Sequence, residues 1–306
     1  MNPVIESNTD RPPSVRGLPS IAPYQTPSPA EIPPNRVSWR PDPGRGVLLI
    51  HDLQEHFLSV FDRTATPCKP MLAHVGAIKR ACQFAGVPVL YTAQSADQSE
   101  EERGLLTDMW GVGIRGNNAG ERIAPEVAPE GQDTLFIKKR YSAFVGNELA
   151  SWMQSRGRDQ IYICGIYGHI GCQVTACDAF MRDIQSFVVR DAIGDFSREH
   201  HVAALTYVAT RCGAVVSSDD LIHDIVGSNR RDRRAATVLG DLAELMGVAS
   251  DEIAPEAVVT DLGVDSLRLM ELAERWTRVF PDLTAMDITS CRTVRELLAL
   301  VEGGPS

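Results

Sequence analysis

The stretch Val47-Leu48-Leu49-Ile50, followed directly by His51 and Asp52, is the first of six short apolar runs that set the fold. Such runs, bounded by polar residues, are typical of strands buried on both faces of a sheet. Amphipathic stretches with helical spacing separate the runs, which indicates repeated βαβ units and a largely parallel sheet. We expect strands at Val47–Ile50, Val87–Thr92, Thr134–Ile137, Ile161–Cys164, Phe187–Val189 and Ala214–Val216, and helices near residues 70–85, 145–156, 172–184 and 198–211. The sequence thus predicts a three-layer α/β/α domain with a mostly parallel sheet.

The two ends of the chain differ from this central part. Residues 1–44 hold 11 of the 19 prolines and show little periodicity, which is typical of a mobile arm or of an extended strap over a domain. Residues 218–231 are polar and favour a solvated linker, with a basic docking patch as the alternative. Helical periods without strand-like alternation then follow at Ala235–Met246, Ser266–Phe280 and Val294–Glu302. We therefore divide the 306 residues into an arm (1–44), an α/β domain (45–217), a linker (218–231) and a small all-α domain (232–303).

Composition and charge exclude several classes of protein. Apolar residues make up 43% of the chain and charged residues 23%, as in folded globular proteins. No apolar run reaches the roughly 18 residues of a membrane helix, and no secretory signal is evident, so we expect a cytoplasmic protein that does not contact membranes. The net charge of −10, of which residues 232–303 contribute −7, argues against a nucleic-acid partner. The seven cysteines are odd in number and include no CxxC pair, which predicts reduced thiols.

The residues that directly follow the apolar runs are the candidates for chemistry, because open parallel sheets bind ligands at the carboxyl ends of their strands. Asp52, Gln94, Lys138 and the glycine-rich segment Gly165–Cys172 stand at these places. A carboxylic acid beside a lysine at a partly buried strand end can exchange a proton. The ordinary alternatives are a turn cap for Asp52, a surface lysine for Lys138 and a structural amide for Gln94.

Three segments resemble the signature segments of the isochorismatases and occur in the same order. They are Ile50-His51-Asp52-Leu53-Gln54-Glu55-His56-Phe57, Lys138-Lys139-Arg140-Tyr141-Ser142-Ala143-Phe144 and Gly165-Ile166-Tyr167-Gly168-His169-Ile170-Gly171-Cys172. The upstream segment 32–39 is similar as well, and the resemblance covers roughly residues 18–217. It implies that Asp52 is the catalytic acid, Lys138 its partner, and Gln94 a contact to the substrate or the attacking water. It also implies substrate contacts from Phe57, Arg103, Trp110, Tyr167 and Gly171.

The resemblance implies hydrolysis of the vinyl ether of isochorismate to 2,3-dihydro-2,3-dihydroxybenzoate and pyruvate. An acid protonates the terminal methylene and water captures the oxocarbenium ion, so Asp52 would supply the proton and no metal would be required. Related cysteine amidohydrolases such as nicotinamidases use an Asp–Lys–Cys triad with a thiolate nucleophile instead. The position of that cysteine falls on Gly171. Cys172 comes one residue later, where a helix turns its side chain about 100° away, so we expect a buried apolar thiol and no covalent thiol chemistry.

Histidines near the expected site do not indicate a metal centre. His51, His56 and His169 lie close to the signature segments, but the nicotinamidase type of metal site is not evident in residues 58–75. We expect His169 to form a hydrogen bond or an oligomer contact and not to bind a metal.

The C-terminal region carries a second motif. Asp261-Leu262-Gly263-Val264-Asp265-Ser266-Leu267-Arg268-Leu269-Met270-Glu271-Leu272 places Ser266 at a helix start, where a serine is ordinarily an N-cap. The segment resembles the attachment motif of phosphopantetheine carrier proteins over residues 235–302. This resemblance implies a four-helix carrier bundle with 4'-phosphopantetheine attached covalently to Ser266, whose phosphodiester the helix dipole would favour.

An isochorismatase joined to a carrier domain resembles the bifunctional isochorismatase/aryl carrier proteins of catechol siderophore biosynthesis, a form of nonribosomal peptide synthesis. The resemblance implies as partners a phosphopantetheinyl transferase, an aryl-acid adenylating ligase and the condensation domain of a nonribosomal peptide synthetase. It also suggests a homodimer formed through the hydrolase domain. Two alternatives stay open: a hydrolase of 2-amino-2-deoxyisochorismate, as in phenazine pathways, and a non-catalytic dimeric scaffold that presents the carrier domain.

Overall fold

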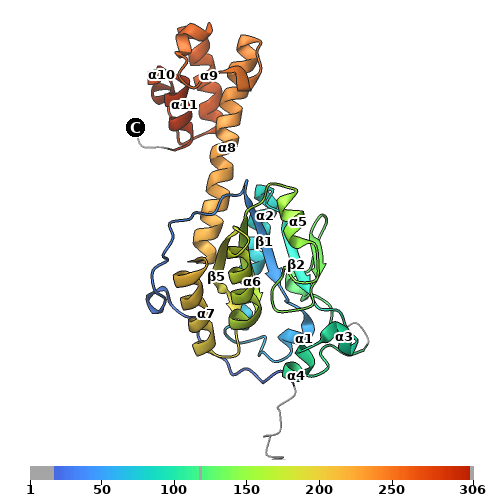
Figure 1. The fold of residues 1–306 in the computed structure, drawn as a ribbon. Coiled ribbons are helices and arrows are strands. Elements are labelled where there is room, and N and C mark those ends of the chain that lie inside the picture. Colours follow the sequence, from blue (N-terminus) through green and yellow to red (C-terminus); the bar gives the residue numbers. More distant parts are fainter. Residues whose placement is uncertain (1–16, 117–118, 304–306) are drawn as a thin grey trace, which may run out of the picture. The chain divides into compact units, whose positions relative to one another are not determined.

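The structure is a computed structural model that describes residues 17–116 and 119–303. An α/β unit and a smaller helical unit are distinct in it, and the chain passes from the first to the second between His223 and Asp224 (Figure 1).

One parallel sheet forms the centre of the α/β unit. All six expected strands are present, and they pair in the order β3-β2-β1-β4-β5-β6. Their bounds are β1 Gly46–His51, β2 Val89–Ala93, β3 Thr134–Ile137, β4 Gln160–Ile166, β5 Gln185–Gly194 and β6 Ala214–Val216. The chain reverses its direction of travel across the sheet between the neighbouring strands β1 and β4, which is where doubly wound sheets bind their ligands.

The strand β3 differs from our expectation of a buried strand. It lies at the edge of the sheet and pairs only with β2, and its side chains alternate between half-buried and exposed, with Leu135 and Ile137 on the exposed face. An edge strand has no second neighbour to cover it, and an apolar run does not reveal this.

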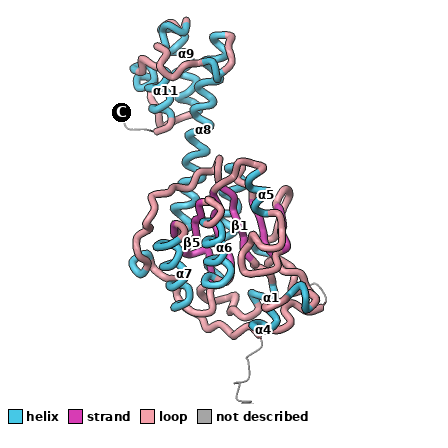
Figure 2. The backbone as a smooth tube through the Cα atoms, in the orientation of Figure 1, coloured by secondary structure: helices cyan, strands magenta, loops and turns pink. Residues whose placement is uncertain are grey.

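Helices cover both faces of the sheet, as Figures 1 and 2 show. On one face, α5 (Leu149–Gln154), α6 (Gln173–Phe180) and α7 (Arg198–Arg211) pack over a core that includes Leu49 and Ile163. On the other face lies α2 (Cys68–Ala85), which contacts β1, β2, β4 and β5. The predicted three-layer α/β/α arrangement is therefore confirmed. Short elements that the sequence analysis did not predict are α1 Glu55–Leu58, α3 Glu100–Arg103, α4 Leu106–Trp110, and the single turns Pro29–Glu31, Pro125–Val127 and Gly168–Cys172.

The described part of the proline-rich arm is an extended strap that lies on the α/β unit. The backbone N–H of Ile21 donates to the carbonyl of Val60 at 2.9 Å, and that of Arg36 donates to the carbonyl of Ala209 at 3.0 Å. The side chain of Asn35 exchanges two further hydrogen bonds with the backbone of Val215. Residues 1–16 of the arm lie outside the described residues.

The smaller unit is a four-helix bundle. It consists of the C-terminal part of α8 (Ser218–Met246), α9 (Ser266–Val279), α10 (Ala285–Ser290) and α11 (Val294–Val301), with 3-10 turns at Ser250–Glu252 and Val259–Leu262. Its largest buried side chain is Trp276, whose Nε1–H donates to Asp241 Oδ2 at 2.7 Å. The other core residues include Val238, Leu242, Leu269, Leu272, Ala273, Phe280, Ile288 and Leu297.

Helix α8 corrects one expectation. It begins at Ser218 and not at Ala235, so residues 218–231 are helical. Ser217 marks the helix start, because its hydroxyl accepts the backbone N–H of Asp220 at 3.1 Å. Leu221 and Ile225 are fully buried one helical turn apart, and the many polar residues around them concealed this spacing. The domain bounds given above stay predictions.

Among the described residues, no helix has both the length and the apolar character that are needed to cross a bilayer. All seven cysteines are free thiols, as their number suggested.

Candidate active site

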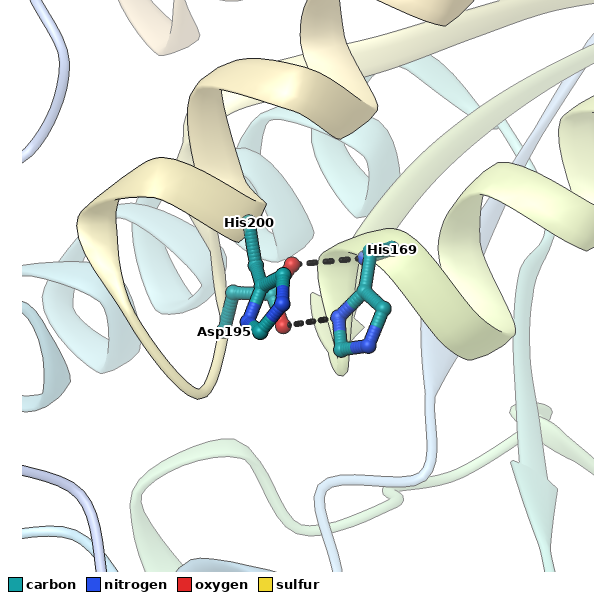
Figure 3. Close-up of side chains that lie close together, drawn as sticks. All are labelled: His169, Asp195 and His200. Atoms are coloured by element: carbon teal, nitrogen blue, oxygen red, sulfur yellow. Dashed lines mark hydrogen bonds and ion pairs between the residues drawn. The ribbon is translucent and has the colours of Figure 1, made fainter.

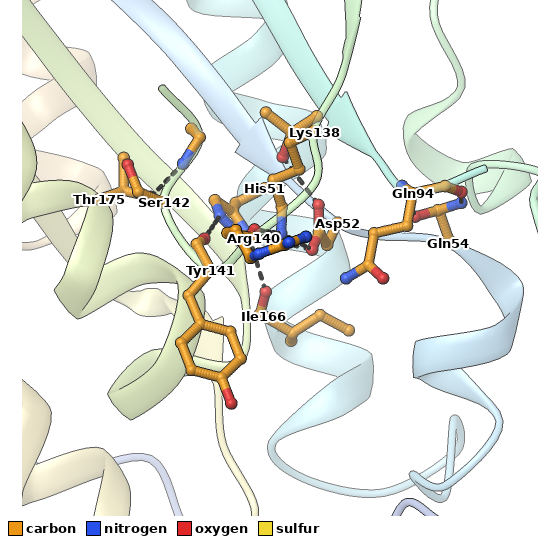
Figure 4. A network of polar contacts seen from close by, with 12 residues as sticks. His51, Asp52, Gln54, Gln94, Lys138, Arg140, Tyr141, Ser142, Ile166 and Thr175 are labelled. Carbon is orange, nitrogen blue, oxygen red and sulfur yellow. Dashed lines mark hydrogen bonds and ion pairs between the residues drawn. The ribbon is translucent and has the colours of Figure 1, made fainter. Parts of the chain in front are cut away.

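Asp52 and Lys138 form a buried ion pair at the carboxyl end of the sheet (Figure 4). Asp52 Oδ2 lies 2.8 Å from Lys138 Nζ, and the two side chains are 7% and 1% exposed. Asp52 follows β1 with a φ of +50°, a left-handed conformation that aspartate adopts more readily than most residues. The hydrogen-bond ladder places its partner, since the backbone N–H of Lys138 donates to the carbonyl of Ala93 at the end of β2. The sheet therefore positions the backbones of the two residues, and the ammonium of Lys138 also donates to the carbonyl of Arg140 at 2.8 Å.

Two opposing effects set the protonation of Asp52. Burial on its own would raise the pKa of this carboxyl group. The charges of Lys138 and His51, with hydrogen bonds from Lys138 and from the Thr92 hydroxyl at 2.8 Å, outweigh burial and hold the pKa of Asp52 below the usual aspartate value. The carboxylate of the free protein is therefore ionised at neutral pH.

Gln94 is held in place by a second glutamine that the sequence analysis missed. The Oε1 atom of Gln54 accepts the backbone N–H of Gln94, and its Nε2–H donates to the backbone carbonyl of Gln94, both at 2.8 Å. The side chain of Gln94 extends toward the same space as Asp52 (Figure 4). Gln54 stands two residues after Asp52 in the first signature segment, and this position could have indicated a role at the site.

All eight residues expected at the site line one cavity of about 380 Å³. They are Asp52, Gln94, Lys138, Phe57, Arg103, Trp110, Tyr167 and Gly171. Cavities of this size accept small organic ligands. The structure therefore brings the predicted residues together, whereas their individual roles stay proposals.

Aromatic side chains form an apolar wall of the cavity. The hydroxyl of Tyr167 donates to the backbone carbonyl of Phe57 at 2.8 Å, and Trp110 Nε1–H donates to the hydroxyl of Tyr141 at 2.7 Å. Phe196 lies between two of these residues, with its ring centre 5.8 Å from that of Trp110 and 4.4 Å from that of Tyr167. Sequence reasoning missed Phe196, because it follows β5 outside every signature segment.

Arg103 adds a buried positive charge. Its side chain donates to the carbonyl of Gly111 at 2.5 Å and to the side chain of Gln98 at 3.4 Å, and the residue is 6% exposed. No carboxylate of the described residues lies within ion-pair distance of its guanidinium. A buried guanidinium without an anionic partner is suited to bind a carboxylate of a ligand.

Comparison with known proteins identifies the family. Residues 46–220 match the family described as Isochorismatase domain. The chain belongs to the isochorismatase family. Residues 236–301 match the family described as Phosphopantetheine attachment site, so this isochorismatase-family protein also has a carrier domain.

Two similar proteins support this assignment across most of the chain. The protein is 40% identical to a protein of Bacillus subtilis named Isochorismatase, over 91% of this chain and 93% of that one. It is 39% identical to enterobactin synthase component B of Escherichia coli K12, over 87% of this chain and 91% of that one. A cysteine hydrolase from Pseudomonas syringae pv. phaseolicola 1448A matches with a TM-score of 0.58 at 20% identity, over 64% of this chain and 98% of that one, which shows a shared fold.

Position 171 of this isochorismatase-family site has no room for a side chain. A Cβ atom on Gly171 would lie 2.2 Å from Cε1 of His51. The His51 ring is fully buried and fixed from two sides, with Nδ1 3.0 Å from the carbonyl of Ile166 and Nε2 3.2 Å from that of Tyr141. The next residue, Cys172, is buried in the core, and burial raises the pKa of its thiol well above the ordinary value. The expectation of a buried apolar thiol is confirmed.

His169, Asp195 and His200 form a cluster beside this site (Figure 3). Asp195 accepts hydrogen bonds from the backbone N–H groups of His169 and Phe196, at 2.6 and 2.8 Å, and pairs with Nδ1 of His169 at 2.5 Å. The rings of His169 and His200 are stacked, with centres 4.3 Å apart and planes 15° from parallel. One ligand atom from each of the three residues lies within 4.8 Å of the other two, a spacing that could hold a metal ion. His169 forms the expected hydrogen bond with Asp195, and the absence of a metal stays a prediction.

Ser266 is the first residue of α9 and is exposed. Its hydroxyl is not the helix cap, because the preceding Asp265 accepts the backbone N–H of Arg268 at 2.9 Å and fills that role. The ordinary reading of Ser266 as an N-cap is therefore wrong, and its hydroxyl is accessible for modification.

Proposed function

We propose that this protein hydrolyses the vinyl ether of isochorismate to 2,3-dihydro-2,3-dihydroxybenzoate and pyruvate by general acid catalysis at Asp52. The observation that supports this most directly is the Asp52–Lys138 pair, 2.8 Å apart, in a cavity that also presents Gln94 and Arg103. An acid, an amide and a buried cation match a substrate that needs one proton and one water and carries carboxylates.

The protonation state of Asp52 changes when the substrate binds. In the free protein its carboxylate is ionised, because Lys138 and the other groups around it lower the pKa. The carboxylates of isochorismate bring negative charge into the cavity, and a nearby like charge raises the pKa of an acid. Asp52 then takes up a proton and gives it to the terminal methylene of the enolpyruvyl group.

Water completes the reaction. It adds to the oxocarbenium carbon, and the proton that it releases returns to the carboxylate of Asp52. The resulting hemiketal breaks its bond to the ring oxygen, its hydroxyl proton passes to that oxygen, and pyruvate and the ring diol are released. In this scheme Gln94 orients the water, and its two hydrogen bonds with Gln54 fix its backbone.

The remaining cavity residues bind the substrate. Arg103 pairs with a substrate carboxylate, because no protein carboxylate of the described residues neutralises it. Phe57, Trp110 and Tyr167 pack against the ring, and Gly171 leaves the floor of the cavity free of a side chain.

The same site disfavours a cysteine amidohydrolase. A thiol at position 171 would collide with His51, and the thiol of Cys172 has a raised pKa and lies in the core. We propose that hydrolysis needs neither a thiolate nor a metal.

The carrier domain extends the proposal to a pathway. A phosphopantetheinyl transferase modifies Ser266, an aryl-acid adenylating ligase loads the arm, and a condensation domain of a nonribosomal peptide synthetase unloads it. We place the protein in cytoplasmic catechol siderophore biosynthesis, as a homodimer through the hydrolase domain. The relative named enterobactin synthase component B supports this role.

Incubation with isochorismate, followed by measurement of pyruvate, tests the hydrolysis. A preference for 2-amino-2-deoxyisochorismate would favour the phenazine-type alternative, and no turnover of either compound would favour a scaffold. Release of ammonia from nicotinamide would favour an amidohydrolase.

A further inference from the structure

The N-terminal strap contributes to the wall of the active-site cavity. Gly17 and Leu18 line this cavity together with Trp110 and Tyr167, although they lie far before β1 in the sequence and outside the matched residues 46–220. Figure 1 shows the start of the strap beside α4. Leu18 is half-buried and is the one strap residue with an apolar side chain in the wall.

On one side, the strap is fastened to the segment that follows α1. Ile21 is 4% exposed, and its backbone N–H donates to the carbonyl of Val60 at 2.9 Å. The backbone N–H of Tyr24 donates to the carbonyl of Thr66 at 3.1 Å. Val60 itself lines the cavity, so the hydrogen bond between Ile21 and Val60 lies next to the part of the wall that Leu18 forms.

On the other side, the strap is fastened to the segment that follows β5. The hydroxyl of Tyr24 accepts the backbone N–H of Asp195 at 2.8 Å and lies 3.1 Å from Nδ1 of His201. His201 Nε2–H in turn donates to the carbonyl of Arg190 at 3.0 Å, which leaves Nδ1 free to accept the hydroxyl proton of Tyr24. Asp195 directly precedes Phe196, another wall residue. The strap is therefore held to wall segments on both sides.

We infer that the strap completes the substrate cavity and that Leu18 is a substrate-binding residue of the hydrolase. The inference rests on the proposed function, because it takes this cavity as the place where the substrate binds. An apolar side chain has no proton or charge to contribute to the reaction. It contacts the substrate equally before and during the reaction, and such contacts change KM and leave kcat unchanged.

Substitution of Leu18 in the full chain tests the inference. Leu18→Ala should raise KM for isochorismate by about fivefold or more, with kcat within about twofold of the wild type. Leu18→Met should keep KM near the wild-type value, because it restores the apolar volume. Ser20→Ala, a change at an exposed strap residue that does not line the cavity, is the matched control and should change neither constant.

A second readout does not depend on the reaction. Acrylamide quenching of Trp110, taken as the difference between each protein and its Trp110→Phe form, should increase in Leu18→Ala and stay unchanged in Ser20→Ala. A KM for Leu18→Ala within twofold of the wild type, or a loss of kcat at constant KM, would overturn the role of Leu18. If the wild type does not turn over isochorismate, the proposed function fails, and unchanged quenching in Leu18→Ala would then overturn the strap inference as well.

Discussion

The imidazole ring of His51 occupies the space into which a side chain at position 171 would have to extend. The nearest ring atom lies 2.2 Å from the Cβ that any residue other than glycine would place there. The ring cannot easily give way, because it lies between the carbonyls of Ile166 and Tyr141, both of which belong to residues of the cavity. The pair His51 and Gly171 therefore sets the shape of the site next to Asp52.

Gly171→Ala should destabilise the hydrolase domain by about 1–3 kcal/mol, as overpacking of a well-packed core does, and should lower its activity. Replacement of His51 by alanine in the same chain should recover part of the lost stability, because the collision is removed. Thermal unfolding of the two single variants and the double variant measures this coupling. Gly240→Ala, within α8 of the smaller unit and with no atom within 4 Å of the added carbon, is the control and should cost no stability, because alanine favours a helix over glycine by about 0.5–1 kcal/mol. Strictly additive losses would contradict the relationship.

Cys172→Ala should keep kcat within about twofold of the wild type. Its thiol is packed in the core and has a raised pKa, so it is neither accessible nor ionised as a nucleophile must be. Steady-state pyruvate release measures the effect. Abolished turnover in a variant that still unfolds cooperatively would favour the thiol mechanism over acid catalysis.

The stability of the hydrolase domain should fall between pH 7 and pH 5 through His201. Burial lowers the pKa of this histidine to about 4, whereas in the unfolded chain it titrates near the ordinary value of about 6.5. Between these two values the unfolded state binds the extra proton, so this contribution is complete above about pH 6.5 and is lost as the pH falls toward about 4. At pH 5 the loss amounts to about 2 kcal/mol.

His201→Gln isolates this contribution, because glutamine retains hydrogen-bonding groups and does not titrate. Calorimetric unfolding at pH 7 and pH 5 should show a smaller loss of stability in the variant than in the wild type. Equal losses in the two proteins would show that His201 is not the group responsible.

Ser266→Ala should prevent attachment of phosphopantetheine and leave the hydrolysis of isochorismate at its normal rate. The exposed hydroxyl stands at the start of α9 in a domain with its own core, and the arm takes no part in protonating a vinyl ether. Intact-protein mass spectrometry after incubation with a broad-specificity transferase gives the answer. Ser290→Ala, a change at another exposed serine of the bundle, is the control and should still be modified. Modification of the Ser266→Ala protein would remove the carrier assignment.

Much of the fold was predictable because each strand contains a short apolar run. All six runs form strands, and Asp52, Gln94 and Lys138 meet at one edge because parallel strands end together. Two expectations were wrong for physical reasons. The burial of β3 depends on a neighbour that an edge strand lacks, and the helix from Ser218 places its few apolar residues among many charged ones.

The features that required the structure are those that join distant segments. Three features belong to this group, because each joins residues that are far apart in the sequence. They are the close approach of Gly171 to His51, the contact of Phe196 with Trp110, and the position of Leu18 in the cavity wall. Local sequence patterns predict helices and strands but do not reveal such contacts. The helix cap at Asp265 is a local feature instead. The sequence placed the helix start correctly to within one residue, but the cap is Asp265 and not the adjacent Ser266.

The rate of pyruvate release from isochorismate by Asp52→Asn, measured against the wild type, tests the central claim most directly. The substitution keeps the size of the side chain and removes the proton that the mechanism transfers. General acids typically contribute about 10²–10⁴-fold to a rate, so we predict a loss of that order, with cooperative thermal unfolding of the variant as proof that the hydrolase domain is folded. A loss of less than about tenfold would contradict the assignment of Asp52 as the proton donor.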